Sequence, residues 1–532
     1  MSEHILMLIE ATGIQEYIFG SNQLAQNIGA SELVTQATTD WVAAKLNELR
    51  LKHNAIKNSK EGWEPNNQSI YADGLQAEIV YMGGGNAMLL FIDDGQAEEF
   101  ARYLTRHALK QAPGLELVLM REPFDSENDV LSKLHQDLRE KLAKRKLNRP
   151  RTSPLLGLGV TAACVYTGMP AVEERDKQLI SAEVREKLDA EQAGKNRLKC
   201  HLQQVEEAGF EFVYNFDDFG EKGESSFLAV IHADGNNMGK RIEAIGERHK
   251  QHNENEKYIA ALRAFSKSVQ EAAETALNTT VDTLLASWDQ GTKFFGGKVP
   301  TPVRDGQEYL PFRPIVFGGD DVTFVAEGRL GLTLAAEYLE TYSRQELSDG
   351  QLAYARAGVA VVKSHYPFSR AYDLADELIG SAKAYIREHV EHGELTALDW
   401  HFAVGGLVLP LKQVREREYI ADDGVRSLLM RPLRLGSPNG DWRSWQVFAK
   451  LLKEFRDENS DWAGRRNKIK AFRDALRGGS DAVQQFLKTY DLKLPDITEM
   501  PDDMKKKGWQ GPYCGYFDAI EALDFYVPLK GE

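Results

Sequence analysis

The sequence predicts an α+β protein that contains two copies of one sheet-forming domain, a helical connector between them and a C-terminal helical bundle. Three observations lead to this fold class. Strand-like segments recur in the two halves of the chain, which is the mark of an internal duplication. Strand and helix signals alternate within each copy, as they do in layered sheets with helices. The last part of the chain shows the apolar spacing of packed helices.

The first repeated element is an apolar, strand-like run that becomes polar after Ala-x-Gly. Leu6–Gln15 (LMLIEATGIQ) matches Leu228–Asn237 (LAVIHADGNN). This alignment sets Thr12 opposite Asp234. A buried strand is therefore expected at the start of each copy.

The second repeated element is a pair of apolar runs joined by a Gly-Gly turn. Val80–Phe91 (VYMGGGNAMLLF) matches Ile315–Val325 (IVFGGDDVTFV). Apolar runs that flank a short glycine turn predict a β-hairpin in each copy.

The third repeated element is a strand followed by Pro-Phe and a helix. Leu115–Glu122 precedes a helical stretch near Val130–Lys146, and Ala355–Lys363 precedes Arg370–His389. Each half therefore has the order β-α-α-β-β-α-β. That order is typical of the ferredoxin-like fold found in palm domains.

These elements divide the chain into four parts. Between the two halves, the charged run Glu173–Glu207 predicts a helical connector. The C-terminal part has helical patterns at Trp442–Phe455, Ala463–Leu476 and Asp481–Tyr490. The predicted parts are a first palm domain (1–158), a connector (159–225), a second palm domain (226–411) and a C-terminal helical domain (412–532).

Composition limits the classes of function. The 532 residues include 80 acids and 65 bases, a formal charge of −15, which disfavours binding of nucleic acid by the whole surface. The three cysteines contain no CxxC pair, so a disulfide framework and a four-cysteine zinc site are excluded. The sequence shows no signal peptide and no membrane-spanning run. We expect a cytoplasmic protein in a reducing compartment, with no membrane partner.

Three acids in the second copy form the candidate catalytic and metal site. Asp234 ends a strand, and Asp320 and Asp321 lie on the hairpin turn that is expected beside it. Carboxylates this close repel one another unless a cation lies between them. Mg²⁺ prefers oxygen ligands and substrate phosphates, and a pair of such ions supports nucleotidyl transfer. Gly318 and Gly319 would let a nucleotide approach the backbone.

An alternative explanation is that Gly-Gly-Asp-Asp is only a favourable turn, because glycine and aspartate are common in turns. The first copy helps to decide between this explanation and a metal site. Its hairpin aligns Gly85 and Asn86 with Asp320 and Asp321. With Thr12 opposite Asp234, the alignment gives this copy no acid at any of the three positions. We therefore expect one working site and one retired site.

Basic residues near these acids are candidates to bind a triphosphate. Lys383 and Arg387 lie four residues apart and so share a helix face, although a solvated basic face is the simpler alternative. Lys240 and Arg241, after the Asp234 loop, are weaker candidates. His232 fits a packed or exposed neutral histidine better than a base, and Asp399-Trp400-His401 fits a structural role.

Several of these segments together resemble a known family. The stretch Gly13–Ser31 (GIQEYIFGSNQLAQNIGAS), then YMGGGN, HADGNNMGK and FGGDD, occur in the same order in the large palm-domain subunit of type III CRISPR effector complexes. Ala357–Tyr385 also resembles that subunit, and the resemblance covers about residues 5–400. The second palm is similar to GGDEF-type nucleotide cyclases, in which a lysine that matches Lys383 helps to bind phosphates.

The resemblance implies a nucleotidyltransferase that makes cyclic oligoadenylate messengers from ATP, with two Mg²⁺ or Mn²⁺ ions, in antiviral defence. By position, Asp234, Asp320 and Asp321 would be catalytic and would bind metal, with the Gly235 carbonyl as a further ligand. The loop residues Asn236, Asn237 and Lys240, the hairpin glycines, Lys383 and Arg387 would bind the nucleotide. Other CRISPR subunits and crRNA or target RNA would be partners, and a homodimer through the palm domains stays open.

The sequence also departs from the family pattern. It has no N-terminal HD nuclease domain, so DNase activity is not expected. Asn236 stands where a second acid is frequent, and Cys164–Ala171 keeps one cysteine of a zinc ribbon, so no zinc is expected. These departures leave open a divergent, stand-alone enzyme, and also a catalytically silent structural subunit of a CRISPR-type ribonucleoprotein. A template-directed polymerase fits the acidic charge less well.

Overall fold

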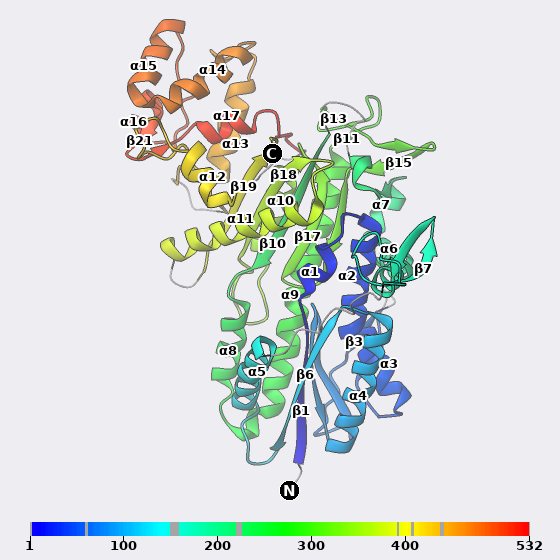
Figure 1. The fold of residues 1–532 in the computed structure, drawn as a ribbon. Helices are drawn as coiled ribbons and strands as arrows, with labels where there is room; N and C mark the ends of the chain where they lie inside the picture. The colour runs from blue at the N-terminus through cyan, green and yellow to red at the C-terminus, as the bar shows by residue number, and fades with distance from the viewer. Residues whose placement is uncertain are drawn as a thin grey trace.

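The computed structural model shows two β-sheets stacked along the long axis of the molecule, with a cluster of helices at the C-terminal end (Figure 1). The N-terminus lies at the opposite end of the molecule. The structure describes residues 3–58, 62–148, 159–219, 226–390, 393–405, 409–436 and 441–530. Residues 149–158 and 220–225, where the sequence sets two domain boundaries, lie outside the described residues.

The first sheet has four antiparallel strands in the order β4-β5-β1-β6. This is the strand order of the ferredoxin-like fold. The side chains of β1 are buried on both faces of the sheet, with Ile5 and Met7 on one face and Leu6 and Leu8 on the other. Burial on both faces explains why this strand is an unbroken apolar run. The strands are β1 (Glu3–Thr12), β4 (Ala77–Gly83), β5 (Asn86–Phe91) and β6 (Glu116–Asp125).

The second sheet repeats this order as β16-β17-β10-β18 and adds two strands at one edge. β19 runs parallel to β18, and β20 closes the edge from a segment beyond residue 411. The predicted α+β class with two ferredoxin-like palm sheets is therefore confirmed. The strands are β10 (Phe227–Gly235), β16 (Phe312–Val316), β17 (Asp321–Glu327), β18 (Ala355–Lys363), β19 (Thr396–Ala403) and β20 (Leu433–Leu435).

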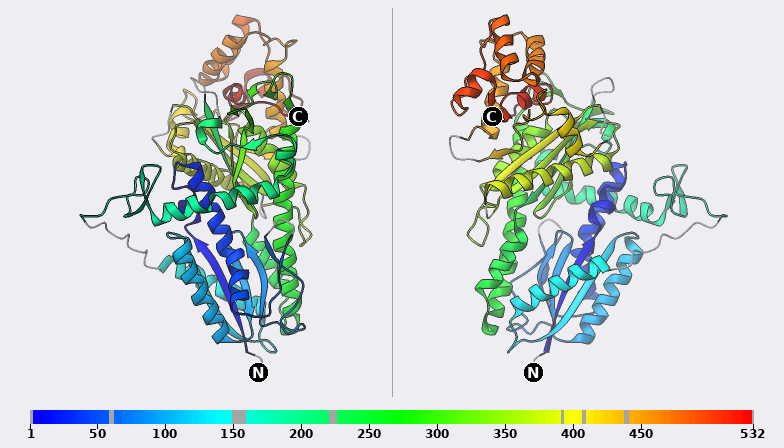
Figure 2. Two further views of the ribbon diagram at one scale, coloured as in Figure 1. Left: turned by 90° about the vertical axis from the view of Figure 1, so that its right-hand side faces the viewer. Right: turned by 60° about the vertical axis from the view of Figure 1, so that its left-hand side comes forward.

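Each half sends helices over to the other half. Helices α1 (Ile14–Phe19) and α2 (Leu24–Thr38) leave the first sheet and reach the second, where the ring of Phe19 stacks on Tyr372 at 3.9 Å. In return, α8 (Met238–Arg248) and the long helix α9 (Asn255–Ala286) run beside the first sheet (Figure 2).

A buried ion pair fixes α9 against the first sheet. The guanidinium of Arg263 donates to Glu78 on β4 at 2.6 Å, and the Glu78 side chain is fully buried. Tyr258 of α9 also lies 2.8 Å from the Nδ1 atom of His135 on α5 (Leu131–Asn148). Because of this exchange, neither half encloses its core without the other.

Helices cover both faces of each sheet. On the second sheet, α11 (Phe368–His389) packs against β10 and β18 from the face that holds Val230 and Val362. α10 (Gly331–Ser343) packs from the face that holds Ile231. The first half also contains α3 (Asp40–Glu48), α4 (Asp94–Gln111) and the hairpin of β2 (Ala55–Lys57) and β3 (Trp63–Pro65). The second half also contains β11 (Trp288–Asp289), β12 (Phe294–Phe295), β13 (Val299–Pro300), β14 (Val303–Arg304) and β15 (Gln307–Leu310).

The connector differs from the prediction at its start. The predicted helix from Glu173 begins only at Ala182, because a hairpin occupies the preceding residues. Its turn residues Asp176 and Lys177 both have positive φ, which matches a tight hairpin turn. The turn lacks the glycine that usually signals such a hairpin. The connector elements are β7 (Ala171–Arg175), β8 (Gln178–Ser181), α6 (Ala182–His201), α7 (Gln204–Glu207) and β9 (Glu211–Phe212).

The C-terminal part is mostly helical, in agreement with the sequence. Its helices pack through buried aromatic side chains such as Phe448, Trp462 and Phe472. Among the described residues, no helix combines the length and apolar character that crossing a bilayer requires. The elements are α12 (Leu411–Glu418), α13 (Trp445–Arg456), α14 (Arg466–Arg477), α15 (Gly479–Tyr490), α16 (Asp502–Lys507), α17 (Phe517–Ala522), β21 (Trp509–Gln510) and β22 (Tyr513–Cys514).

A buried arginine joins this helical part to the second sheet. The Arg431 guanidinium lies 3.2 Å from Asp518 and 2.9 Å from Glu521 on α17, and 3.9 Å from Asp399 on β19. Asp399 also accepts two hydrogen bonds from Arg415, both at 2.8 Å. The Asp399-Trp400-His401 segment therefore holds the palm edge and the C-terminal helices together.

We expect Arg431→Met to lower the free energy of unfolding by about 3–5 kcal/mol, because it leaves buried carboxylates without their cation. Chemical denaturation would measure the change. The control is Arg417→Met, since Arg417 is exposed and pairs with its neighbour Glu418. Equal stability of the two variants would contradict the proposed role of the Arg431 network.

Candidate active site

The three predicted acids come together where β10 ends and β17 begins. Asp234 lies directly opposite Asp321 in the antiparallel pair of these strands. The Gly235 amide donates to the Asp320 carbonyl at 3.0 Å. A Cβ atom on Gly235 would lie 2.9 Å from the Cβ of Asp320 and 2.5 Å from Met238, so only glycine fits beside the turn. The structure thus places all three carboxylates in one cluster, as the sequence predicts.

The crowding of these acids changes their ionisation. Burial, together with the charges of Asp234 and Asp321, raises the pKa of Asp320 to about 7. Burial also raises the pKa of Asp234, and the nearby Arg356 offsets this only in part. The cluster therefore favours a bound proton or a bound cation.

Arg356 is a site residue that the sequence analysis missed. It lies on β18 directly opposite Asp234, and its buried guanidinium pairs with the Asp234 carboxylate. The same group donates to the Gly235 carbonyl at 3.2 Å and to the Asn236 side-chain oxygen at 2.8 Å. An arginine thus contacts two of the oxygen ligands that the family resemblance assigns to metal.

His232 also belongs to the cluster, and it is buried, which confirms a packed rather than an exposed histidine. Its Nε2 atom lies 3.0 Å from Asp321, and its Nδ1 atom lies 3.6 Å from Asp376 on α11. Burial lowers the pKa of His232, but the carboxylates of Asp321, Asp376 and Asp234 outweigh it, so the net pKa is raised. The alternation of β10 places His232 and Asp234 on one face, a signal that the sequence contains.

The candidate phosphate-binding residues divide into two groups. Lys383 is close enough to Asp234 to lower the pKa of its carboxyl. Arg387 is exposed one turn later on α11, and Lys240 is exposed on α8. Among the contacts that the structure describes, neither of these two reaches the three acids. Arg241 is not part of the cluster, because its guanidinium forms a bidentate ion pair with Asp349.

The loop after Asp234 has a structural role. The buried Asn236 amide donates to the Gly393 and Leu395 carbonyls at 3.1 and 2.8 Å. Asn237 has a left-handed backbone and lies at the N-cap position of α8, where its side chain makes no capping hydrogen bond. The side chain of Asn236 is thus already bonded on both of its polar atoms, which argues against the predicted contact with a nucleotide through this side chain.

The hairpins of the two halves face each other. A Cβ atom on Gly319 would lie 3.9 Å from the Gly84 backbone. A cavity of about 130 Å³ lies between the two glycine turns and is bounded on one side by Asp320. Gly318 has a φ of +107°, which glycine alone adopts readily. The second site therefore opens toward the first copy.

The register of the strands corrects the predicted repeat. Glu10 pairs with Asn86, and the Ala11 amide donates to the Gly85 carbonyl at 2.7 Å. In the second copy, Asp234 pairs with Asp321 and the Gly235 amide donates to the Asp320 carbonyl in the same way. Glu10, rather than Thr12, is therefore the counterpart of Asp234. The expectation that the first copy keeps no acid at the three positions is wrong.

Glu10 has a partner that mirrors the second site. Its carboxylate lies 2.5 Å from the ammonium of Lys146 on α5. Lys146 and Lys383 are each the sixteenth residue of the helix that follows the fourth palm strand. Both copies therefore place a helical lysine near the acid at the end of the first strand.

The oxygen donors of the cluster fit one divalent cation. Two carboxylates, Asp234 and Asp320, and the Gly235 carbonyl supply the hard oxygen ligands that Mg²⁺ prefers. Among the described residues, no three His, Cys, Asp or Glu side chains form a metal-binding group. With Arg356 already beside Asp234, the residues fit one ion completed by substrate phosphates better than two ions.

Comparison with known proteins agrees with this architecture. Residues 227–390 match the family described as Cas10/Cmr2, second palm domain. No curated protein matches the chain by sequence.

Solved structures resemble the whole chain in fold. A Csm1-Csm4 cassette in complex with pppApApA has a TM-score of 0.56 at 12% identity and covers 99% of this chain and 70% of that chain. The Csm1-Csm4 subcomplex of the type III-A CRISPR-Csm interference complex has a TM-score of 0.53 at 15% identity, with the same coverage. Csm1 of T. onnurineus has a TM-score of 0.51 at 14% identity, covering 98% and 70%. The chain is therefore similar to the large palm-domain subunit of type III CRISPR complexes, and its residues 227–390 match the second palm domain of Cas10/Cmr2.

Proposed function

We propose that this protein is a metal-dependent nucleotidyltransferase that joins ATP into cyclic oligoadenylates. The observation that carries the proposal is the cluster of Asp234, Asp320 and Asp321 beside Lys383, at a cavity between two glycine turns. Similar chains have been solved with pppApApA and with cA4. Those ligands belong to the Csm1-Csm4 cassettes and support adenylates as the substrate class here.

Each residue has a role in the proposed reaction. Asp234, Asp320 and the Gly235 carbonyl would hold a Mg²⁺ or Mn²⁺ ion, which when bound supplies charge neutralisation at the reacting phosphate. Lys383 would bind the outgoing pyrophosphate, and Gly318 and Gly319 would admit the nucleotide to the backbone. A ribose hydroxyl forms a bond to the α-phosphorus, the bond to the pyrophosphate oxygen breaks, and the hydroxyl proton passes to the carboxylate cluster.

A second candidate function follows from Arg356. Its guanidinium neutralises Asp234 without a metal, as expected of a catalytically silent subunit that binds guide or target RNA within a CRISPR-type ribonucleoprotein. Copurified small RNA, together with full function after replacement of Asp320 and Asp321 by alanine, would favour this candidate. Csm1 forms a subcomplex with Csm4 in a similar solved structure, and we propose a comparable cytoplasmic partner here, with a homodimer as the alternative.

We expect Asp320→Asn to abolish pyrophosphate release from ATP and Mn²⁺, with a loss of about 100-fold or more. The variant should also be more stable than the wild type at pH 8 without metal. The folded-state pKa of Asp320, about 7, lies above its ordinary value. The wild type therefore loses stability as pH rises through this interval, and the asparagine does not.

Melting temperatures at pH 5 and pH 8 in EDTA would measure this difference. The advantage of Asp320→Asn should shrink at pH 5, where the wild-type carboxyl is protonated. Asp503→Asn, at an exposed position on α16, is the matched control for loss of one charge. Unchanged pyrophosphate release by the Asp320→Asn variant would contradict the proposed reaction.

Lys383→Ala should raise the KM for ATP about tenfold, which corresponds to about 1.4 kcal/mol of binding. Arg387→Ala should have a smaller effect, because of these two residues it is Lys383 whose charge acts on Asp234 in the described structure. Steady-state kinetics with ATP would compare the two variants. A larger defect in Arg387→Ala would show that the triphosphate binds elsewhere on α11.

Arg356→Met should make the protein more dependent on divalent cations. Removal of the guanidinium leaves Asp234 without its partner, so the metal-free protein should lose up to about 3 kcal/mol. Added Mn²⁺ should then raise the melting temperature of the variant more than that of the wild type. Arg344→Met, at an exposed site, is the control. Equal Mn²⁺ shifts in all three proteins would contradict competition between Arg356 and a cation.

A further inference from the structure

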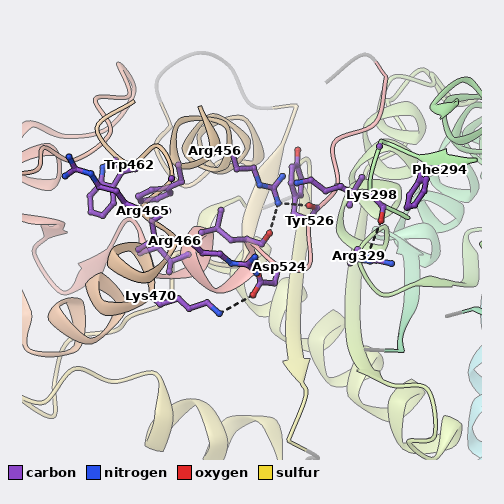
Figure 3. A pocket seen from close by; sticks show the side chains of 17 residues that line it. Phe294, Lys298, Arg329, Arg456, Trp462, Arg465, Arg466, Lys470, Asp524 and Tyr526 are labelled. Carbon is purple, nitrogen blue, oxygen red and sulfur yellow. Dashed lines mark hydrogen bonds and ion pairs between the residues drawn. The ribbon is translucent and has the colours of Figure 1, made fainter. Parts of the chain in front are cut away.

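A second cavity lies at the other end of the second sheet. β17 begins at Asp321 in the carboxylate cluster and ends at Glu327, two residues before Arg329 on the cavity wall. The cavity has a volume of about 670 Å³. It lies between α13, α14 and α17 of the C-terminal part and the β12–β13 turn of the second half (Figure 3). It is therefore separate from the candidate active site.

The walls of this cavity carry a large excess of positive charge. One acid, Asp524, lines the cavity. It pairs with two of the bases, Arg466 and, at 3.8 Å, Lys470 (Figure 3). The basic residues on the walls, called here the basic cavity, are Lys298, Arg329, Arg456, Arg465, Arg466 and Lys470.

Among the described residues, half of these bases have no acidic partner. Arg329 pairs with Glu327 at 2.7 Å, but the hydrogen bonds that Arg456 donates in the described structure go to the neutral Leu523 and Tyr526 carbonyls. In the part of the chain that the structure describes, no acidic side chain pairs with Lys298 or Arg465. Bases from three distant segments thus converge without matching acids.

The charge excess acts on Lys298. Burial, the larger cause, and the charges of Arg456 and Arg466 lower the pKa of the Lys298 ammonium, despite the presence of Asp524. The share of this shift that comes from the arginine charges also favours a bound anion, whereas the share that comes from burial does not.

The start of α14 adds to the same preference. Helix N-termini carry a partial positive charge and usually attract acids. Here two arginines occupy this end, Arg465 as the cap and Arg466 as the first residue, and no side chain caps the helix. An anion in the basic cavity would relieve both the arginine charges and the helix dipole.

We propose that the basic cavity binds the phosphate groups of a nucleotide-sized ligand. Its volume falls within the usual range of about 300–1,000 Å³ for small-ligand sites. Arginine suits this role because its planar guanidinium can hold two phosphate oxygens at once. Trp462, Phe455 and Tyr526 are buried behind the basic groups and keep the walls rigid. The ligand would bridge the C-terminal helices and the second sheet.

The test is calorimetric binding of inorganic triphosphate, ATP and a short single-stranded RNA in EDTA, where the metal-dependent active site does not contribute. The wild type should bind at least one probe, with affinity that falls as salt rises. The double variant Lys298→Ala/Arg465→Ala should lose about tenfold or more in affinity. Neither residue has an ion-pair partner in the described structure, so folding should persist, as the melting temperature would verify.

The three probes distinguish the source of the phosphates. Binding of triphosphate and ATP alike indicates phosphate recognition alone, tighter binding of ATP indicates a nucleotide, and binding of RNA alone indicates an oligonucleotide. Lys453→Ala/Lys488→Ala, which removes two exposed lysines outside the cavity, is the matched control. Absence of binding by all three probes, or equal binding by the two double variants, would overturn the proposal.

Discussion

Repulsion among the carboxylates of Asp234, Asp320 and Asp321, at one hydrogen-bonded turn, determines which charged groups surround this part of the second palm. The antiparallel pairing of β10 and β17 leaves Asp234 and Asp321 no freedom to separate. The surrounding elements respond with groups that stabilise negative charge: Arg356 from β18, His232 from β10, whose pKa is raised by the acids, and Lys383 from α11. These three groups stabilise the negative charge of the carboxylates. A bound cation could take over only part of that role.

The two copies show how much of this arrangement is inherited from the fold. In the first copy, Glu10 and Lys146 occupy the places of Asp234 and Lys383 and form a direct ion pair. The turn there carries no acid, so one lysine is sufficient to neutralise it. In the second copy, two more carboxylates have been added, and the lysine alone no longer balances the charge. The acid–lysine pair therefore belongs to the scaffold, and the extra acids are what makes the second copy chemically distinct.

The sequence predicted what depends on local pattern. Alternating apolar runs and the glycine turns predicted the strands of both sheets and the proximity of Asp234, Asp320 and Asp321. The two-residue error at Thr12 arose because side chains on a strand repeat every two residues, so a shift by two leaves the apolar face unchanged. Hydrogen bonds between strands, which fix the register, have no signature in a single sequence.

Residues missed by the sequence analysis act across long separations in the chain. Arg356 meets Asp234 only because β18 lies beside β10, and nothing near either residue in the sequence signals that contact. The basic cavity likewise draws on segments near residues 298, 329 and 456–470. The hairpin before α6 was mistaken for helix because its turn uses Asp176 and Lys177 in place of glycine.

The exchange of helices between the halves bears on why the first copy persists. α9 begins and ends in the second half of the sequence, yet its Arg263 is neutralised by Glu78 of the first. Loss of the first copy would expose the apolar face of α9 to water and leave the Arg263 guanidinium without its partner. Selection on solubility alone would then preserve the first copy, whatever its own chemistry.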